Sequence, residues 1–503
     1  MGKQRKTKNI DLTVGNITSS LWKFAVPLML GNVLQQLYNL VDTWVVGHYI
    51  GDNALAAVGS SYTLMTFLTS IVIGLCLGSS AFLSMAYGKK DQDLIRNGIF
   101  ISAVMIGSLA VILTGIIYIW MNPMIRLLQV PQETTAAMRE YLFYVFIGFF
   151  ATFLYNYVAN VLRGIGNSVT PLFFLGISVI LNIFLDLYMV AVLNLGVAGA
   201  AYATFIAQGI SAVLSLIIFI VTLQKLPGKA EGWLSKTEFS DMSRIALPSI
   251  LQQSTVSIGM MLVQSVVNSF GTQILAGFSA AMRIESLCVV PMSAIGNAMS
   301  SYTAQNIGAE KEERISQGYR MGNFMIIVIA VILCLFLEIA HKPLVALFLD
   351  NAASSQTIVT GESYLKFIGF FFCMIGFKMA VDGILRGAGA VRVFTIANLV
   401  NLTLRVTIAK FGAPIWGVSM VWYAVPLGWL ANFLISYGYY RTGKHLTRAQ
   451  RKKVCFQEPY DLCADGTQTH AGTLHHLACQ IPSTIRTVAG PVFLPHLYHL
   501  YAN

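Results

Sequence analysis

Four acidic side chains stand inside long apolar stretches of this sequence: Asp42, Asp186, Glu285 and Asp382. A charge within apolar surroundings is costly unless it is paired or used, so each is a candidate functional residue. Carboxylates bind hard cations and carry transferable protons. These four positions therefore predict chemistry with a proton or a cation. The competing interpretation is a hydrogen bond between helices that only supports packing.

The first two acids have polar neighbours at helical spacing. Asp42 follows Tyr38 by one turn, and Asp186 follows Asn182 by one turn, so each pair shares one helical face. Asn156 and Thr204 lie in neighbouring apolar segments and approach these acids if the first half of the chain closes around its own cavity. We therefore predict a coupling site for a cation or a proton. Its residues are Asp42, Asp186, Asn182, Tyr38, Asn156 and Thr204.

The remaining embedded charges are secondary polar candidates. Glu285 follows Arg283, and its role is open between internal pairing and proton handling. Asp382 lies near Lys378 and Arg386, either of which can neutralise it, so a structural role is favoured. Arg405 stands inside a later apolar segment, where it binds substrate or pairs with an acid.

Composition indicates what positions these residues. The chain has 503 residues, of which 56% are hydrophobic and only 11% charged, with a mean hydropathy of +0.66. Soluble domains carry about 25% charged residues, whereas crossing a bilayer takes roughly 20 apolar residues. Segments of that length repeat and are too long for barrel strands, so they predict helices. The expected spans are 19–45, 54–86, 97–121, 140–162, 169–193, 197–223, 244–268, 275–305, 319–340, 363–385, 393–411 and 415–438.

An internal repeat divides these twelve spans into two sixes. The sequence RGIG at Arg163 recurs as RGAG at Arg386, and each arginine follows a Tyr-Leu pair, at Tyr141 and Tyr364, by 22 residues. Further matches, such as GDNALAAVG from Gly51 and GTQILAGFS from residue 271, run in the same order. Because each half contains six spans, both halves begin on the same side of the membrane. This arrangement predicts a parallel repeat.

The predicted fold is therefore an all-α integral membrane protein with two six-helix lobes. Its expected parts are a cytoplasmic N-terminal segment 1–18, an N-lobe 19–223, a linker 224–243, a C-lobe 244–440 and a tail 441–503. Pro27 and Pro248 stand at matching positions in the first span of each lobe. A proline removes a helical hydrogen bond, so these two are hinge candidates or static kinks.

The net charge of +11 reports orientation rather than a polyanionic partner. Most Lys and Arg residues fall in loops on the side of the N-terminus, which places both termini in the cytoplasm of a multi-pass protein of the cell membrane. No nucleic-acid partner is expected. We expect a monomer that meets small organic substrates and membrane lipid.

Several stretches resemble the multidrug and toxic compound extrusion (MATE) family, particularly its DinF-like branch. They are NLVDTWVVGHYIGDNALAAVG, QNIGAEKEERI, LRGIGNSVTP, LRGAGAVR and PIWGVSMVWYAVPLGWLANF, within residues 15 to 444. The resemblance implies alternating access and exchange of an organic substrate for Na⁺ or H⁺. It implies a cation site, with Na⁺ as one occupant, at Asp42, Asn182 and Asp186, and less specific roles for Tyr38, Asn156 and Thr204. The seventh span carries Gln252, Gln253 and Gln264 where another branch has a coupling acid, which favours coupling in the N-lobe.

The leading hypothesis is a secondary active antiporter that exports organic cationic or amphipathic compounds in exchange for H⁺ or Na⁺, without a cofactor. A lipid or oligosaccharide-lipid flippase is the alternative, favoured by embedded arginines. An intramembrane enzyme is less favoured, because the sequence has no zinc motif, nucleophile motif or phosphate loop. The 441–503 tail departs from the family, and its histidines and cysteines match no zinc spacing.

Overall fold

The computed structural model describes residues 9–50, 52–127, 132–225, 235–349 and 354–443, and the tail expected at 441–503 lies almost entirely outside them. These residues form helices and no strands. In chain order the helices are α1 (Ile17–Tyr49), α2 (Asp52–Lys89), α3 (Gln92–Leu127), α4 (Gln132–Gly164), α5 (Val169–Asp186), η1 (Leu187–Val192), α6 (Gly196–Lys225), α7 (Lys236–Asn268), α8 (Thr272–Gly308), α9 (Glu313–Leu347), α10 (Ser355–Gly369), α11 (Phe372–Gly387), α12 (Val391–Thr407), η2 (Ile408–Gly412), α13 (Ala413–Trp416) and α14 (Ser419–Arg441).

The described helices confirm the predicted membrane architecture. Eleven of them are long and apolar enough to cross a membrane, and one bent pair brings the total to twelve. Large aliphatic side chains are exposed on the outer faces of these helices, for example Ile119 at 77% and Ile339 at 82%. Water would oppose such exposure along a whole helix face, whereas lipid tails accept it.

The tenth span differs from the single helix predicted over 363–385. It consists of α10 and α11, which meet at an angle of 54°. The same letters FIGFF occur at 146–150 in the unbroken α4 and at 367–371 beside the break. However, the step from Gly369 to Arg386 is two residues longer than the step from Gly148 to Arg163. Two extra residues rotate the following part of a helix by about 200°. The break between α10 and α11 absorbs this rotation, so the FIGFF segment and the arginine motif can face the same way as their counterparts in α4.

Two spans end in π-helical turns that the sequence did not reveal. Helix α5 ends at Asp186 and continues as η1, where the Leu193 amide donates to the Tyr188 carbonyl five residues earlier, at 2.9 Å. Helix α12 continues into η2 in the same way. Widened turns of this kind occur frequently at functional sites. The first one begins directly after a candidate acid.

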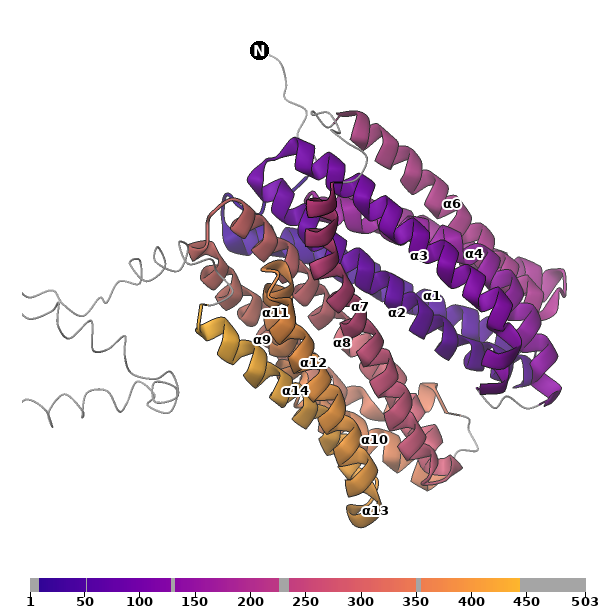
Figure 1. Cartoon of the computed structure of the whole chain (residues 1–503). Coiled ribbons are helices and arrows are strands. Elements are labelled where there is room, and N and C mark those ends of the chain that lie inside the picture. Colours follow the sequence, from indigo (N-terminus) through magenta and orange to yellow (C-terminus); the bar gives the residue numbers. More distant parts are fainter. Residues whose placement is uncertain (1–8, 51, 128–131, 226–234, 350–353, 444–503) are drawn as a thin grey trace, which may run out of the picture. The chain divides into compact units, whose positions relative to one another are not determined.

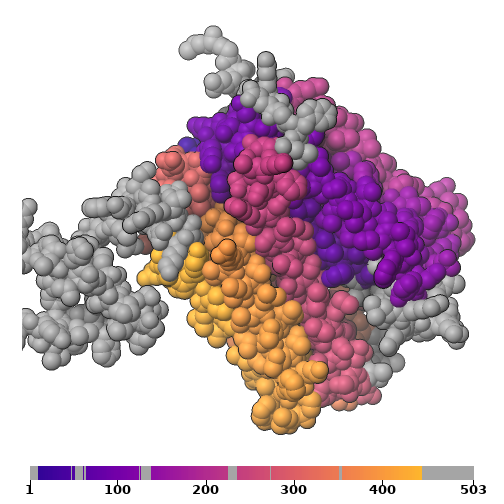
Figure 2. Space-filling view, in the orientation of Figure 1, coloured from indigo at the N-terminus to yellow at the C-terminus, as the bar shows by residue number. Residues whose placement is uncertain are grey.

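Contacts between the lobes show the predicted repeat. Helices α1 to α6 form one group and α7 to α14 the other (Figure 1). In the first lobe α1 packs on α5 and also crosses to α8, while in the second lobe α7 packs on α12 and also crosses to α2. These contacts are equivalent once the first helix is matched with the seventh and the second with the eighth. On the surface, α7 follows the border between the two groups (Figure 2).

Residues 9–16 form a strap across the ends of the two lobes. The Ile10 amide donates to the carbonyl of Gly166 in the RGIG turn of the N-lobe at 2.8 Å. Four hydrogen bonds among the described residues reach the C-lobe. They are Leu12 N–H to Gln305 Oε1 at 3.1 Å, Asn306 Nδ2 to the Leu12 carbonyl at 3.3 Å, Lys311 Nζ to the Thr13 carbonyl at 2.9 Å and Arg314 Nη2 to the Gly15 carbonyl at 3.2 Å. The Leu12 side chain is fully buried. The strap therefore ties the lobes together on the side of the N-terminus.

Candidate functional site: a polar cavity between the lobes

A cavity of about 530 Å³ lies between the two lobes and is lined by side chains from both. Its N-lobe wall comes from α1, α2, α4, α5 and α6, and its C-lobe wall comes from α7, α8 and α11. The lining is rich in amides, hydroxyls and charges, among them Asp42, Asn156, Gln252, Asn297 and Asp382. This space lies where two lobes that rock against each other would expose a bound molecule to alternate sides.

Asp42 and Asp186 come together in the N-lobe, as predicted from their positions on α1 and α5. Asp42 lines the cavity, and Asp186 lies behind it with no exposed surface. The two carboxyls are within interaction distance of each other. Asn182, one turn before Asp186, is equally buried. Helix α5 turns the last two side chains inward because its buried face runs through positions 175, 178, 179, 182 and 186.

Several polar atoms of this cluster have no hydrogen-bond partner of ordinary geometry among the described residues. They are Oδ1 of Asp42, both carboxyl oxygens of Asp186 and both side-chain amide atoms of Asn182. Buried polar groups normally have hydrogen-bond partners, because a buried donor or acceptor left without a hydrogen bond costs about 1–3 kcal/mol. Uncommitted oxygens around two carboxyls form the donor set that a proton or a hard cation takes. The chemistry of the site therefore fits H⁺ or Na⁺.

The weaker predicted members surround this cluster. The Tyr38 hydroxyl donates to Thr204 Oγ1 at 2.9 Å, which links α1 to α6. Asn156 uses its amide nitrogen on the Thr152 carbonyl at 2.8 Å and lines the cavity. The hydrogen bond between Tyr38 and Thr204 thus joins two helices of the wall that carries Asp42, and Asn156 lines the same cavity.

Two residues near the acids were missed by the sequence reasoning. Tyr141 on α4 lies within electrostatic range of Asp42 and Asp186 and lines the cavity. Gln208 on α6 forms a very short contact with Thr152 Oγ1 and also lines the cavity. Gln208 stands one helical turn after Thr204, so its spacing carried a usable signal. In the sequence, Tyr141 was noted only as part of the repeated Tyr-Leu pair.

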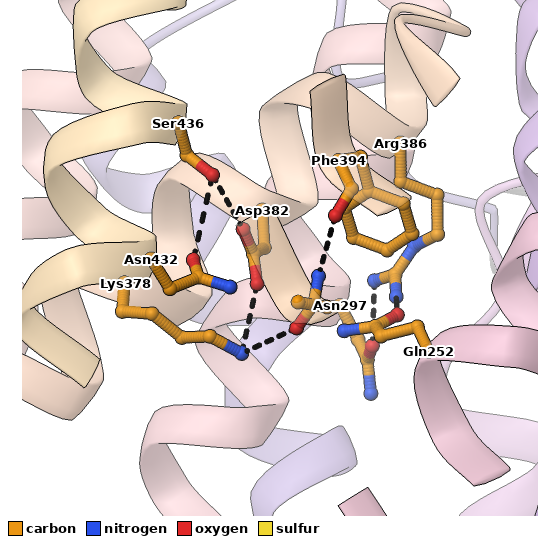
Figure 3. Close-up of polar contacts among 9 residues, drawn as sticks. Gln252, Asn297, Lys378, Asp382, Arg386, Phe394, Asn432 and Ser436 are labelled. Carbon is orange, nitrogen blue, oxygen red and sulfur yellow. Dashed lines mark hydrogen bonds and ion pairs between the residues drawn. The ribbon is translucent and has the colours of Figure 1, made fainter. Parts of the chain in front are cut away.

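The C-lobe holds a different polar cluster around Asp382. Lys378 Nζ lies 2.8 Å from Asp382 Oδ2, and both side chains are almost wholly buried. The same ammonium donates to Asn398 Oδ1 at 3.2 Å, and the Ser436 hydroxyl donates to Asp382 Oδ1 at 3.0 Å. Figure 3 shows Asp382 between Lys378 and Ser436. Of the two cations predicted as partners, Lys378 is the one that pairs with Asp382.

Glu285 and Arg405 are both buried and lie outside the cavity lining. The Tyr364 hydroxyl donates to Glu285 Oε2 at 2.6 Å, and Arg405 interacts electrostatically with the same carboxyl. Arg283, considered above as an internal partner, is exposed on the opposite side of α8. Residues two apart point in different directions on a helix, which agrees with the exposure of Arg283 and the burial of Glu285. Pairing of Arg405 with this acid stays a prediction.

The two arginines of the repeat motif reach the same end of the cavity. Arg386 on α11 donates to Ser300 Oγ at 3.1 Å, to Gln252 Oε1 at 3.4 Å and to Asn297 Oδ1 at 2.8 Å. Figure 3 shows its guanidinium directed at Gln252 and Asn297. Arg163 on α4 also lines the cavity, and its Nε atom is buried without a partner among the described residues. Neither arginine was named as a site residue from the sequence.

Pro27 and Pro248 lie inside α1 and α7, and both helices continue past them. The structure shows one arrangement of each helix, so hinge duty stays a prediction. Of the three glutamines noted in the seventh span, Gln252 and Gln253 line the cavity, while Gln264 donates to Ser279 Oγ at 3.2 Å. Among the described residues, no group of three His, Cys, Asp or Glu side chains is arranged to hold a metal ion.

Two related helical lobes around a shared polar cavity define a membrane transporter. A family model described as MatE matches residues 27–188 and again 248–410, so the chain belongs to the MatE family, as its motifs predicted. The double match falls on the two lobes and agrees with the repeat. Because the family consists of transporters, the expectation of a transporter rather than an enzyme is confirmed.

Individual relatives agree with this assignment. The probable multidrug resistance protein YpnP of Bacillus subtilis (strain 168) is 31% identical over 439 residues, which cover 87% of this chain and 98% of the relative. DNA damage-inducible protein F of Escherichia coli (strain K12) is 23% identical over 341 residues, covering 66% of this chain and 73% of the relative. A solved structure of a MATE protein in complex with MaL6 has a TM-score of 0.81 at 24% identity, covering 89% of this chain and all of that one.

Proposed function

We propose that this MatE transporter is a secondary active antiporter that exports organic cationic or amphipathic compounds in exchange for H⁺ or Na⁺. The observation that carries the proposal is the pair Asp42 and Asp186, buried side by side with uncommitted oxygens at the edge of the cavity between the lobes. Two ionised carboxylates in such a place repel each other. Binding a proton or a cation relieves that repulsion.

The coupling step follows from the position of this pair. Asp42 faces the cavity, whereas Asp186 and Asn182 lie behind it, so a cation bound by all three also changes the charge of the cavity wall. A positively charged group of a substrate in the cavity is attracted to Asp42 only when the site has released its cation. Substrate and coupling ion therefore bind in alternation. This alternation is the requirement for exchange.

The acids of the C-lobe differ from those of the N-lobe, and this difference supports coupling in the N-lobe. The cavity-facing acid of the C-lobe, Asp382, holds the ammonium of Lys378 at 2.8 Å. Because the ammonium of Lys378 already neutralises the Asp382 carboxylate, this carboxylate needs no cation from solution. Glu285 is engaged by Tyr364 and lies near Arg405, outside the cavity lining. We assign the coupling ion to Asp42, Asp186 and Asn182, and supporting positions to Tyr38, Thr204 and Asn156.

The transporter is proposed to act as a monomer in the cell membrane with both termini in the cytoplasm. One chain lines the cavity from both sides, so a second copy is not needed to complete the site. The excess of Lys and Arg in the loops on the side of the N-terminus supports the orientation. That orientation places the strap of residues 9–16 on the cytoplasmic side.

The test is transport in proteoliposomes under imposed H⁺ or Na⁺ gradients. Wild-type protein should move a fluorescent organic cation against its gradient under at least one of these conditions. Asp42→Asn and Asp186→Asn should abolish that gradient-driven uptake, whereas Glu285→Gln, which alters a buried acid outside the cavity, should retain it. Uptake that depends on neither gradient, or that is retained in both Asp42→Asn and Asp186→Asn, contradicts the proposal. Lipid scrambling by wild type without solute movement would instead support a flippase.

A further inference from the structure

The repeat lets the surroundings of Arg163 be compared with those of Arg386 position by position. Helices α2 and α8 run without interruption from Asp52 and Thr272, and shortly after each helix ends one residue has a positive φ, Lys90 in the N-lobe and Glu310 in the C-lobe. This fixed register matches Leu77 with Asn297. These matches allow the hydrogen-bond acceptors of the two arginines to be compared directly.

Arg163 lacks the amide acceptors that Arg386 uses. Asn297, which accepts from Arg386 at 2.8 Å, is matched by Leu77 in the N-lobe. Gln252, four residues after Pro248, is matched by Gly31, four residues after Pro27. Leucine and glycine side chains accept no hydrogen bond. Both line the cavity, so neither of these matched positions offers Arg163 an acceptor.

Among the described residues, no carboxylate interacts with the charge of Arg163. The ionisable groups that interact with it are Tyr155 and Cys76, and its Nε atom has no hydrogen-bond partner among the described residues. Arg386 interacts with Asp382, but that acid is already paired with Lys378. A small recess next to the cavity is lined by both arginines. Two guanidinium groups at one end of an enclosed space attract an anion.

We propose that Arg163, together with Arg386, forms an anion subsite at the end of the cavity near the RGIG turn, so that preferred substrates carry a carboxylate or phosphate group. The inference deepens the proposed export function and names its substrate class. A cationic group of the same molecule then faces Asp42, and an oxyanion group faces the arginines. Substrates with both groups match the cavity better than simple organic cations.

The test compares two ligands that differ only in the anionic group. Rhodamine B carries a free carboxylate, and its ethyl ester has the same aromatic cation without it. Binding of each is measured by fluorescence polarisation to the full chain in phosphatidylcholine nanodiscs, with the same buffer on all sides. We expect rhodamine B to bind about tenfold more tightly than the ester, as one charge-assisted contact in a buried site provides. A ratio near one in wild type overturns the proposal.

Variants separate the subsite from folding effects. Arg163→Gln should bring the ratio of the two affinities close to one, and Arg163→Lys should retain part of it. Leu77→Asn keeps the charge but supplies the acceptor found at Asn297, so it should also lower the ratio. Arg244→Gln removes an arginine that is 77% exposed outside the cavity and should leave the ratio unchanged. A wild-type ratio in both Arg163→Gln and Leu77→Asn overturns the proposal.

Further arms identify the source of the anion and separate this proposal from the coupling proposal. Phosphatidylglycerol in the nanodisc removes the preference for rhodamine B if a lipid headgroup occupies the subsite, and leaves it intact if the subsite receives soluble compounds. Both outcomes retain the anion subsite. The measurement uses no ion gradient, so Asp42→Asn can lose gradient-driven transport and still keep the ratio of affinities.

Discussion

At the scale of single residues, the two lobes use charge in opposite ways. In the part of the chain that the structure describes, the N-lobe gathers two acids, Asp42 and Asp186, without a basic partner, whereas the C-lobe pairs Asp382 with Lys378 at 2.8 Å. Arg405 occupies the position that matches Asp186 in the repeat. A cluster without its own cation needs one from outside. A cluster that contains one serves the structure.

Removing Lys378 should therefore destabilise the protein. Lys378→Met leaves the Asp382 carboxylate buried beside Ser436 without a cation, which costs about 3–5 kcal/mol in comparable buried pairs. The double change Lys378→Met with Asp382→Asn should restore most of the loss. Thermal unfolding of the purified protein in detergent measures both. A single variant as stable as wild type would show that the pair contributes nothing.

The sequence predicted the residues of the N-lobe cluster but not all their neighbours. Asp42, Asp186 and Asn182 could be identified because charge and amide groups are rare in apolar segments, and helical spacing placed Asn182 and Asp186 on one face of their helix. The role of Tyr141 depends on how α4 packs beside α1, which spacing within one helix does not reveal. The same limit applies to Glu285, whose partner Tyr364 lies 79 residues away.

At the scale of elements, matching prolines in α1 and α7 test whether bending of a helix contributes to transport. Pro27→Ala and Pro248→Ala each restore a backbone donor and remove a helix-breaking ring. If the helices bend during the cycle, both variants should unfold at a temperature equal to or above that of wild type but transport more slowly. Stopped-flow uptake in proteoliposomes gives the rate. An unchanged rate with a higher unfolding temperature would identify the prolines as static kinks.

The break between α10 and α11 shows where reasoning from the repeat reached its limit. The equal spacing of 22 residues from Tyr-Leu to Arg suggested two equivalent helices. Within that spacing, the FIGFF segment is shifted by two residues in the C-lobe, so the equal total conceals a change of register. The break absorbs this change, and the α10–α11 angle is 54°. Hydropathy alone could not detect it, because both pieces are apolar.

At the scale of the whole molecule, α2 and α8 lie in close contact at the end of the lobes near the N-terminus. Gly308 packs against the backbone of Met85, and the strap of residues 9–16 crosses the same end of the lobes. Gly308→Leu should hold this end apart, because a side chain there meets backbone that cannot move aside. The variant should also reduce transport.

The distance between the lobes measures that effect. Spin labels at Lys90 and Arg320, with the native cysteines replaced, report on the two lobes at this end. Gly308→Leu should shift their distance distribution to longer values, and Gly438→Leu, which meets no neighbouring atom, should not. The expectation is wrong if the two variants give the same distribution. The strap itself was not foreseen, because Ile10, Leu12 and Val14 alternate with polar residues over too few positions to indicate what they contact.

The central claim is that the N-lobe acids hold the ion that is exchanged for substrate. Addition of a transported compound to the purified protein, without any gradient, should release H⁺ or Na⁺ into a weakly buffered solution. Wild type and Glu285→Gln should release the ion, and Asp42→Asn should release none at a compound concentration that saturates the variant. Undiminished release from Asp42→Asn, with loss of release in Glu285→Gln, would contradict the account and place the exchanged ion in the C-lobe.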